Sequence, residues 1–158
     1  MPDVLGVIST YHQAVDDPEF ARRGYDSGYL VTRAGTRAAD FYGTNPDPEV
    51  VALDEANKEI FSLTEYPDGL LSTLPGMSSL ITVPVLVVDG SRDRMVCGPG
   101  FSTCTDTPTL DAAEQPYFSP AAQLRTFVLP DSGHAINLAP NTRDYHAAVL
   151  DWMKSLAN

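Results

Sequence analysis

Two short polar segments of the chain contain side chains that could perform catalysis together. Gly90-Ser-Arg-Asp93 follows the most apolar stretch of the sequence, and Asp131-Ser-Gly-His134 follows the next apolar run. An aspartate that orients a histidine allows the imidazole to act as general base toward a hydroxyl nucleophile, as acyl-transfer hydrolysis requires. We therefore take Asp93 as the candidate orienting acid and His134 as the candidate base.

The elements around these segments predict a layered α/β fold. Five of the six residues 83–88 are apolar and mostly β-branched, which is typical of a central strand buried on both faces. Residues 124–129 predict a second strand. A helix capped at Thr107-Pro108 and an amphipathic helix at the end of the chain follow these strands in turn. In such folds the loops after parallel strands meet at one edge of the sheet, where functional residues gather.

The first half of the chain gives weaker signals. The apolar run 4–8 predicts a buried strand. Asp17-Pro-Glu19 and Asp47-Pro-Glu49 each predict a helix start, because each places a capping aspartate before a proline and an acid. Residues 24–43 have no clear period and are read as loop or short helices. Asp89 and Asp131 are read as turn or solvent-facing residues.

The second half of the chain resembles the α/β-hydrolase family. Ile81-Thr-Val-Pro-Val-Leu-Val-Val-Asp-Gly-Ser-Arg-Asp93 looks like its seventh strand and acid loop, and Val128-Leu-Pro-Asp-Ser-Gly-His134 looks like its histidine loop. By the same likeness, residues 4–10 resemble the sixth strand and residues 12–80 a helical cap. The resemblance implies a partial hydrolase core formed by 1–11 and 81–158, covering about strands six to eight, with Asp93 and His134 in the catalytic triad.

The sequence departs from the family in its nucleophile. The nucleophile elbow G-x-S-x-G does not occur in the sequence. The resemblance implies that strands one to five, which would carry it, lie outside this chain. The nearest strings are Gly6-Val-Ile-Ser9-Thr10 and Gly76-Met-Ser78-Ser-Leu80, and both lack the small flanking residues of the elbow. His12 would face the mouth of the pocket if residues 4–10 formed the sixth strand. Ser9 and His12 are therefore candidate pocket residues only.

The two cysteines, Cys97 and Cys104, lie in a loop rich in glycine, proline, serine and threonine. They could close a small disulfide ring or remain free thiols, and the sequence leaves both states open. No second cysteine pair or nearby histidine completes a zinc ligand set, so we expect no metal and no other cofactor. His146, within the last helix, is read as a surface or packing residue.

Composition restricts the class of protein. The chain has 158 residues, 43% of them hydrophobic, and a formal charge of −11, as expected for a soluble globular domain that does not bind nucleic acid. No apolar run reaches the length of a membrane span. The first residues lack the features of a signal peptide, so we expect a cytoplasmic protein, or a secreted one whose N-terminal part is missing.

Three functions agree with these observations. The first is a hydrolase of small ester-like acyl substrates whose serine comes from another segment or chain, so that this chain alone is inactive. The second is a non-catalytic half-domain that assembles with a second chain or a second copy to complete its sheet. The third is a fragment of an Asp-nucleophile hydrolase that acts on halides or epoxides.

Overall fold

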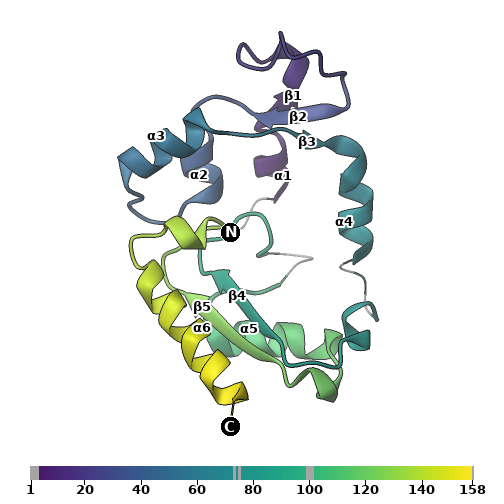
Figure 1. The fold of residues 1–158 in the computed structure, drawn as a ribbon, viewed down its shortest axis with the longest axis vertical. Coiled ribbons are helices and arrows are strands. Elements are labelled where there is room, and N and C mark those ends of the chain that lie inside the picture. Colours follow the sequence, from purple (N-terminus) through teal and green to yellow (C-terminus); the bar gives the residue numbers. More distant parts are fainter. Residues whose placement is uncertain (1–3, 73, 75, 99–101, 158) are drawn as a thin grey trace.

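The computed structural model describes residues 4–72, 74, 76–98 and 102–157, and it is a mixed α/β structure with two small sheets. Figure 1 shows one sheet near each end of the molecule, with α4 along one side between them. The helices and strands are α1 (Val4–Ile8), β1 (Tyr11–Gln13), β2 (Tyr29–Thr32), α2 (Arg37–Phe41), α3 (Pro48–Ala56), β3 (Phe61–Ser62), α4 (Tyr66–Ser72), β4 (Leu86–Gly90), α5 (Thr107–Glu114), β5 (Arg125–Leu129) and α6 (Thr142–Leu156).

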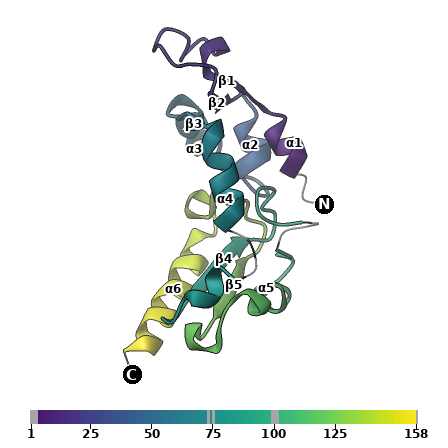
Figure 2. The ribbon, with the colours of Figure 1, turned by 90° about the vertical axis from the view of Figure 1, so that its right-hand side faces the viewer.

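The second half of the chain forms the parallel sheet that the sequence predicts. β4 and β5 pair in parallel, with Leu86 opposite Arg125 and Gly90 opposite Leu129. Figure 2 shows this sheet between α5 and α6. The strand predicted at 83–88 lies a few residues later in the chain, and its side chains before Gly90 are half-buried. It is not central within the described residues, because β5 is its only neighbour there.

Local signals place the helices of this half correctly. α5 ends at Glu114, before Pro116, and its cap is Asp106, whose side chain accepts the N–H of Thr109, rather than the predicted Thr107. α6 turns Tyr145 and Trp152 toward partial burial. The apolar stripe of α6 is wider than the surface that covers it, since Met153 stays 54% exposed.

The first half contains an antiparallel sheet that the sequence analysis did not anticipate. β1 pairs with β2 and β2 pairs with β3, so the segment predicted as a helical cap holds strands as well as helices. Its core consists of Ala14, Phe20 and Val31, with tyrosines packed around them. The helix predicted after Asp47 is present as α3, and the Asp47 carboxylate accepts the N–H of Glu49 as a cap. Strand signals were weak here because each strand has four residues or fewer.

The strand predicted at residues 4–8 is wrong, because this segment is the helix α1. A short apolar run fits either state, and the partners available decide between them. Two hydroxyls end this helix: Ser9 donates to the carbonyl of Gly6, and Thr10 donates to the carbonyl of Val7. Val7 is fully buried whereas Ile8 is exposed. The likeness of residues 4–10 to a sixth strand is lost with this correction.

The helix predicted at Asp17 is also wrong. Asp17 accepts the N–H of Glu19, as a cap would, but only a single turn follows before Gly24, which has φ +77°. The second oxygen of the Asp17 carboxylate is engaged by His12 and Lys58. Tertiary contacts therefore outweigh the local helix signal. No helix among the described residues is long and apolar enough to cross a membrane.

Candidate active site

Asp93 and His134, 41 positions apart in the chain, meet at the carboxyl ends of β4 and β5. His134 Nδ1 lies 2.8 Å from Asp93 Oδ2. The Asp93 side chain is 2% exposed and that of His134 is 45% exposed. The carboxylate is therefore withdrawn from water while the imidazole keeps an open side. This edge of the sheet faces the half of the molecule that carries β1 to β3 (Figure 1).

The acid loop holds the Asp93 carboxylate with its own backbone. Asp93 Oδ1 accepts the N–H of Met95 at 2.7 Å and the N–H of Val96 at 3.1 Å. The Asp93 N–H donates to the carbonyl of Gly90, which tightens the turn at the end of β4. Since both carboxylate oxygens are bonded, the charge of this buried group is compensated and its orientation is fixed.

Close backbone packing sets the distance between the acid and histidine loops. An added Cβ at Gly90 would lie 2.3 Å from the carbonyl oxygen of Ser132, so only glycine permits this approach. Arg92 N–H donates to the same carbonyl. Gly133 is equally crowded, since its Cβ would lie 2.6 Å from the carbonyl oxygen of Phe41. Gly90 is therefore the position where the acid and histidine loops touch, and Gly133 is where the histidine loop touches the end of α2.

The end of α2 and the segment after it form hydrogen bonds with the histidine loop from the other half of the molecule. Ala135 N–H donates to the carbonyl of Phe41, and Thr44 N–H donates to the carbonyl of Asp131. The Phe41 ring lies 6.1 Å from the His134 ring, centroid to centroid. This contact covers part of the imidazole with apolar surface.

The electrostatics of the pair favour a charged imidazole. The hydrogen bond to Asp93 raises the pKa of His134 above its usual value, and the carboxylates of Asp93 and Asp89 add to this, while burial opposes it. A base with raised affinity for a proton is suited to take one from a hydroxyl and hold it beside a carboxylate.

Asp89, which the sequence analysis read as a turn or solvent-facing residue, is a half-buried neighbour of this pair. Burial raises its pKa to about 7, with the charges of Asp93 and Glu114 adding to the effect and His134 opposing it. An acid directly after a run of β-branched residues was the available signal, because strands rarely bury a carboxylate without a partner.

A hollow of about 350 Å³ lies beside the acid loop. Its lining joins the two halves of the molecule: Tyr42, Gly43, Thr44, Ser91, Arg92, Asp93 and Arg94. Arg94 is held at its wall by the carbonyl of Ala39 and the buried carboxylate of Asp40. Asp93 is the member of the pair that lines this space, which could admit a small molecule.

The two candidate pocket residues, Ser9 and His12, lie elsewhere in the described structure. Ser9 is exposed at the end of α1. His12, on β1, has its Nε2 2.9 Å from Asp17 Oδ2. No hydrogen bond or ion pair described for Ser9 or His12 joins it to Asp93 or His134.

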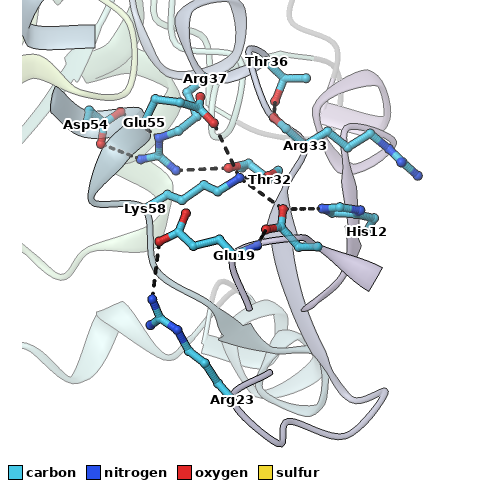
Figure 3. A network of polar contacts seen from close by, with 11 residues as sticks. His12, Glu19, Arg23, Thr32, Arg33, Thr36, Arg37, Asp54, Glu55 and Lys58 are labelled. Atoms are coloured by element: carbon cyan, nitrogen blue, oxygen red, sulfur yellow. Dashed lines mark hydrogen bonds and ion pairs between the residues drawn. The ribbon is translucent and has the colours of Figure 1, made fainter. Parts of the chain in front are cut away.

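His12 instead belongs to a polar network inside the first half, drawn in Figure 3. Lys58 Nζ lies 3.2 Å from Asp17 Oδ2, 3.2 Å from the carbonyl oxygen of Thr32 and 3.5 Å from a Glu55 oxygen. The side chains of Lys58 and Asp17 are 5% and 4% exposed. This network ties β1, β2 and the end of α3 together. Sequence reasoning missed it because its members are far apart in the chain.

Cys97 and Cys104 form a disulfide in this structure, which joins the two ends of the loop after Asp93. Together with Asp89 they are the one trio in the described part of the chain whose ligand atoms lie close enough for a metal, within 4.8 Å of one another. Because thiolates rather than disulfide sulfurs are metal ligands, the bonded pair offers no such site in this state.

No protein-family model matches the chain, and no curated protein matches it.

Proposed function

We propose that this chain carries the acid and the histidine of an acyl-transfer hydrolase of the α/β-hydrolase type. The observation that carries the proposal is the 2.8 Å contact between His134 Nδ1 and a buried Asp93 carboxylate that two backbone N–H groups fix in place. This arrangement leaves Nε2 of a half-exposed imidazole available to a reacting hydroxyl. The resemblance of residues 81–134 to the family's acid and histidine loops supports the same assignment.

The proposed mechanism assigns one proton path to the pair. His134 Nε2 takes the proton of a hydroxyl while the hydroxyl oxygen attacks the acyl carbon of a small ester-like substrate. Asp93 stabilises the imidazolium that results, and His134 then gives the proton to the departing alcohol. Water repeats the cycle on the acyl intermediate. Among the described residues no hydroxyl is bonded to His134 Nε2, so the nucleophile comes from another segment or another polypeptide.

The first test measures the pair itself. Histidine proton signals are followed by NMR from pH 5 to 9 in the native chain and in Asp93→Asn. We expect the pKa of His134 to fall in the variant, because the strongest contribution that raises it is the hydrogen bond to the carboxylate. An unchanged His134 titration contradicts the proposed pairing.

The second test measures chemistry. Hydrolysis of p-nitrophenyl acetate is compared for the native chain, His134→Ala and His146→Ala, since His146 is an exposed histidine on α6. We expect His134→Ala alone to lower the rate. With the polypeptide that carries the nucleophile present in the assay, a native rate no higher than that of His134→Ala contradicts the role of His134 as a base. A fluorophosphonate probe with intact-mass analysis then locates the nucleophile, on this chain or on a polypeptide that purifies with it.

The open sheet supports a second proposal, that another polypeptide completes it. Parallel sheets are normally covered on both faces and extended at their edges, yet β4 has one neighbour within the described residues. Val83, just before β4, is 63% exposed, and Leu150 and Met153 on α6 are each 54% exposed. Light scattering after size-exclusion chromatography tests this function. A stable monomer at micromolar concentration, with no co-purifying partner, contradicts it.

A further inference from the structure

The Cys97–Cys104 disulfide belongs to the same loop that holds the acid of the pair. Met95 and Val96, whose N–H groups bind Asp93 Oδ1, immediately precede Cys97 in the chain. Any change in the position of Cys97 is therefore transmitted within one or two residues to the groups that fix the carboxylate. The loop has no strand or helix between Asp93 and Cys97 to isolate one from the other.

Both cysteines of the disulfide are buried in the core between the sheet and α5. Cys97 and Cys104 are 3% and 4% exposed and pack in one cluster with Leu110 of α5 and Val128 of β5. Cys97 Sγ also lies 3.9 Å from the carbonyl oxygen of Gly90, the oxygen that accepts the N–H of Asp93. The disulfide thus links the acid turn to the buried cluster between the sheet and α5.

We propose that the Cys97–Cys104 disulfide is a positioning element of the acid–histidine pair: it holds the loop whose N–H groups orient Asp93, and its reduction loosens the Asp93–His134 contact. The inference rests on the proposed function, in which Asp93 and His134 act as a pair. It makes activity at the pair depend on the redox state of two cysteines that do not touch His134 in any described contact.

The redox step needs a dithiol reductant such as dithiothreitol. One thiolate of the reductant attacks a cysteine sulfur, the S–S bond breaks, and the second thiol of the reductant closes its own disulfide. The protein gains two electrons and two protons and is left with two thiols, while the dithiol loses the same number of each. Without the covalent link, Met95, Val96 and Cys97 regain conformational freedom.

The charged groups near His134 determine the readout. Asp93 and Asp89, both from β4 and its loop, face the imidazole and favour its charged form. Glu114, at the end of α5, acts on Asp89. Of these, only Asp93 depends on the N–H groups of Met95 and Val96 for its orientation. A change in His134 titration on reduction therefore reports the position of Asp93.

The experiment compares the oxidised chain, the chain reduced with dithiothreitol, and the double variant Cys97→Ser/Cys104→Ser. Mass analysis checks the gain of two hydrogens on reduction, and circular dichroism checks that each form is folded. The pKa of His134 is then measured by NMR in all three forms and in Asp93→Asn. We expect reduction and the double serine variant each to lower the pKa at least halfway from the oxidised value to the Asp93→Asn value.

Two controls separate positioning from general loosening. In the Asp93→Asn background, reduction should leave the His134 titration unchanged, because the carboxylate it would displace is already gone. Lys58→Met, which weakens the molecule far from the pair, should also leave it unchanged. If reduction lowers the pKa of His134 by less than half of the difference between the oxidised chain and Asp93→Asn, the inference is overturned. If Asp93→Asn itself does not lower the pKa, the proposed pair fails first, and the two failures are thereby distinguished.

Discussion

Replacing Lys58 by methionine tests whether the buried network in Figure 3 holds the first half of the molecule together. Methionine keeps most of the apolar stem and removes the charge. Asp17 Oδ2 and the carbonyl of Thr32 each lose a partner at 3.2 Å, in a place where the Asp17 side chain is 4% exposed. Stranding one member of a buried ion pair costs about 3–5 kcal/mol.

The remaining contacts of Asp17 set the expected value at the lower end of that range. His12 stays 2.9 Å from the same carboxylate oxygen, and the N–H of Glu19 stays on the other. We therefore expect a loss of about 3 kcal/mol in the free energy of unfolding. For a chain of this size that lowers Tm by about 6–12 °C.

The assay is urea unfolding at pH 7 followed by far-UV circular dichroism, with Arg23→Gln as the matched control. Arg23 pairs with Glu19 at 3.4 Å in the same region, but the two side chains are 48% and 40% exposed, so its loss should cost about 1 kcal/mol or less. If Lys58→Met falls within 1 kcal/mol of this control, the network does not contribute as a buried ion pair, and the reasoning is refuted.

The pH dependence of the same network has a defined sign. Burial alone raises the pKa of Asp17, but the N–H of Glu19 and the side chains of His12 and Lys58 outweigh it and lower the pKa below the usual value. A carboxylate with a lowered pKa stabilises the folded state at pH values above its unfolded pKa of about 3.9, and this stabilisation is lost as the pH falls. Acid unfolding should therefore begin at higher pH in Lys58→Met.

Three further predictions concern the site. Asp93→Asn should lose more stability at pH 6 than at pH 9. The raised pKa of His134 stabilises the native folded state at low pH, and this stabilisation is lost as the pH rises. Urea melts at both pH values measure the two losses. Asp89→Asn should become more stable relative to the native chain as the pH rises from 5 to 8, because the raised pKa of about 7 makes the charged Asp89 carboxylate costly in the folded state. A difference in the free energy of unfolding that stays constant across that range contradicts this prediction. Gly43→Ala should lower the free energy of unfolding by about 1–3 kcal/mol, because the added Cβ would lie 1.8 Å from the backbone oxygen of Asp131 in the loop after β5. Gly69→Ala on α4 is the control in the same thermal melts, since its Cβ would meet nothing within 4 Å.

The sequence predicted the second half of the fold because its signals there are local. The β-branched run before Gly90 and Pro116 each favour a strand or end a helix within a few residues of their own position. β4, α5, β5 and α6 therefore lie near their predicted positions. The first half gave fewer such signals. Its run at 4–8 suits a helix or a strand equally, and its strands are too short to show alternation.

The candidate pair could be predicted from its place after two strands, but the groups that orient it could not. Asp93 and His134 were evident because parallel strands bring their following loops to one edge. The N–H donors of Met95 and Val96 carry no mark in the sequence, since every residue but proline has such a group. The sequence signalled the half-burial of Asp89 only through its place next to the β-branched run, and the extent of that burial depends on contacts that folding creates.

The sequence by itself determined the elements of the second half, the two loops that carry the acid and the histidine, and the acidic character of the chain. Tertiary structure alone decided that residues 4–8 form a helix and that His12 joins Asp17 and Lys58. It also decided that the two cysteines form a disulfide beside the acid loop. The physical reason is range: propensity, capping and periodicity act over a few residues, whereas burial and charge pairing depend on residues that only folding brings together.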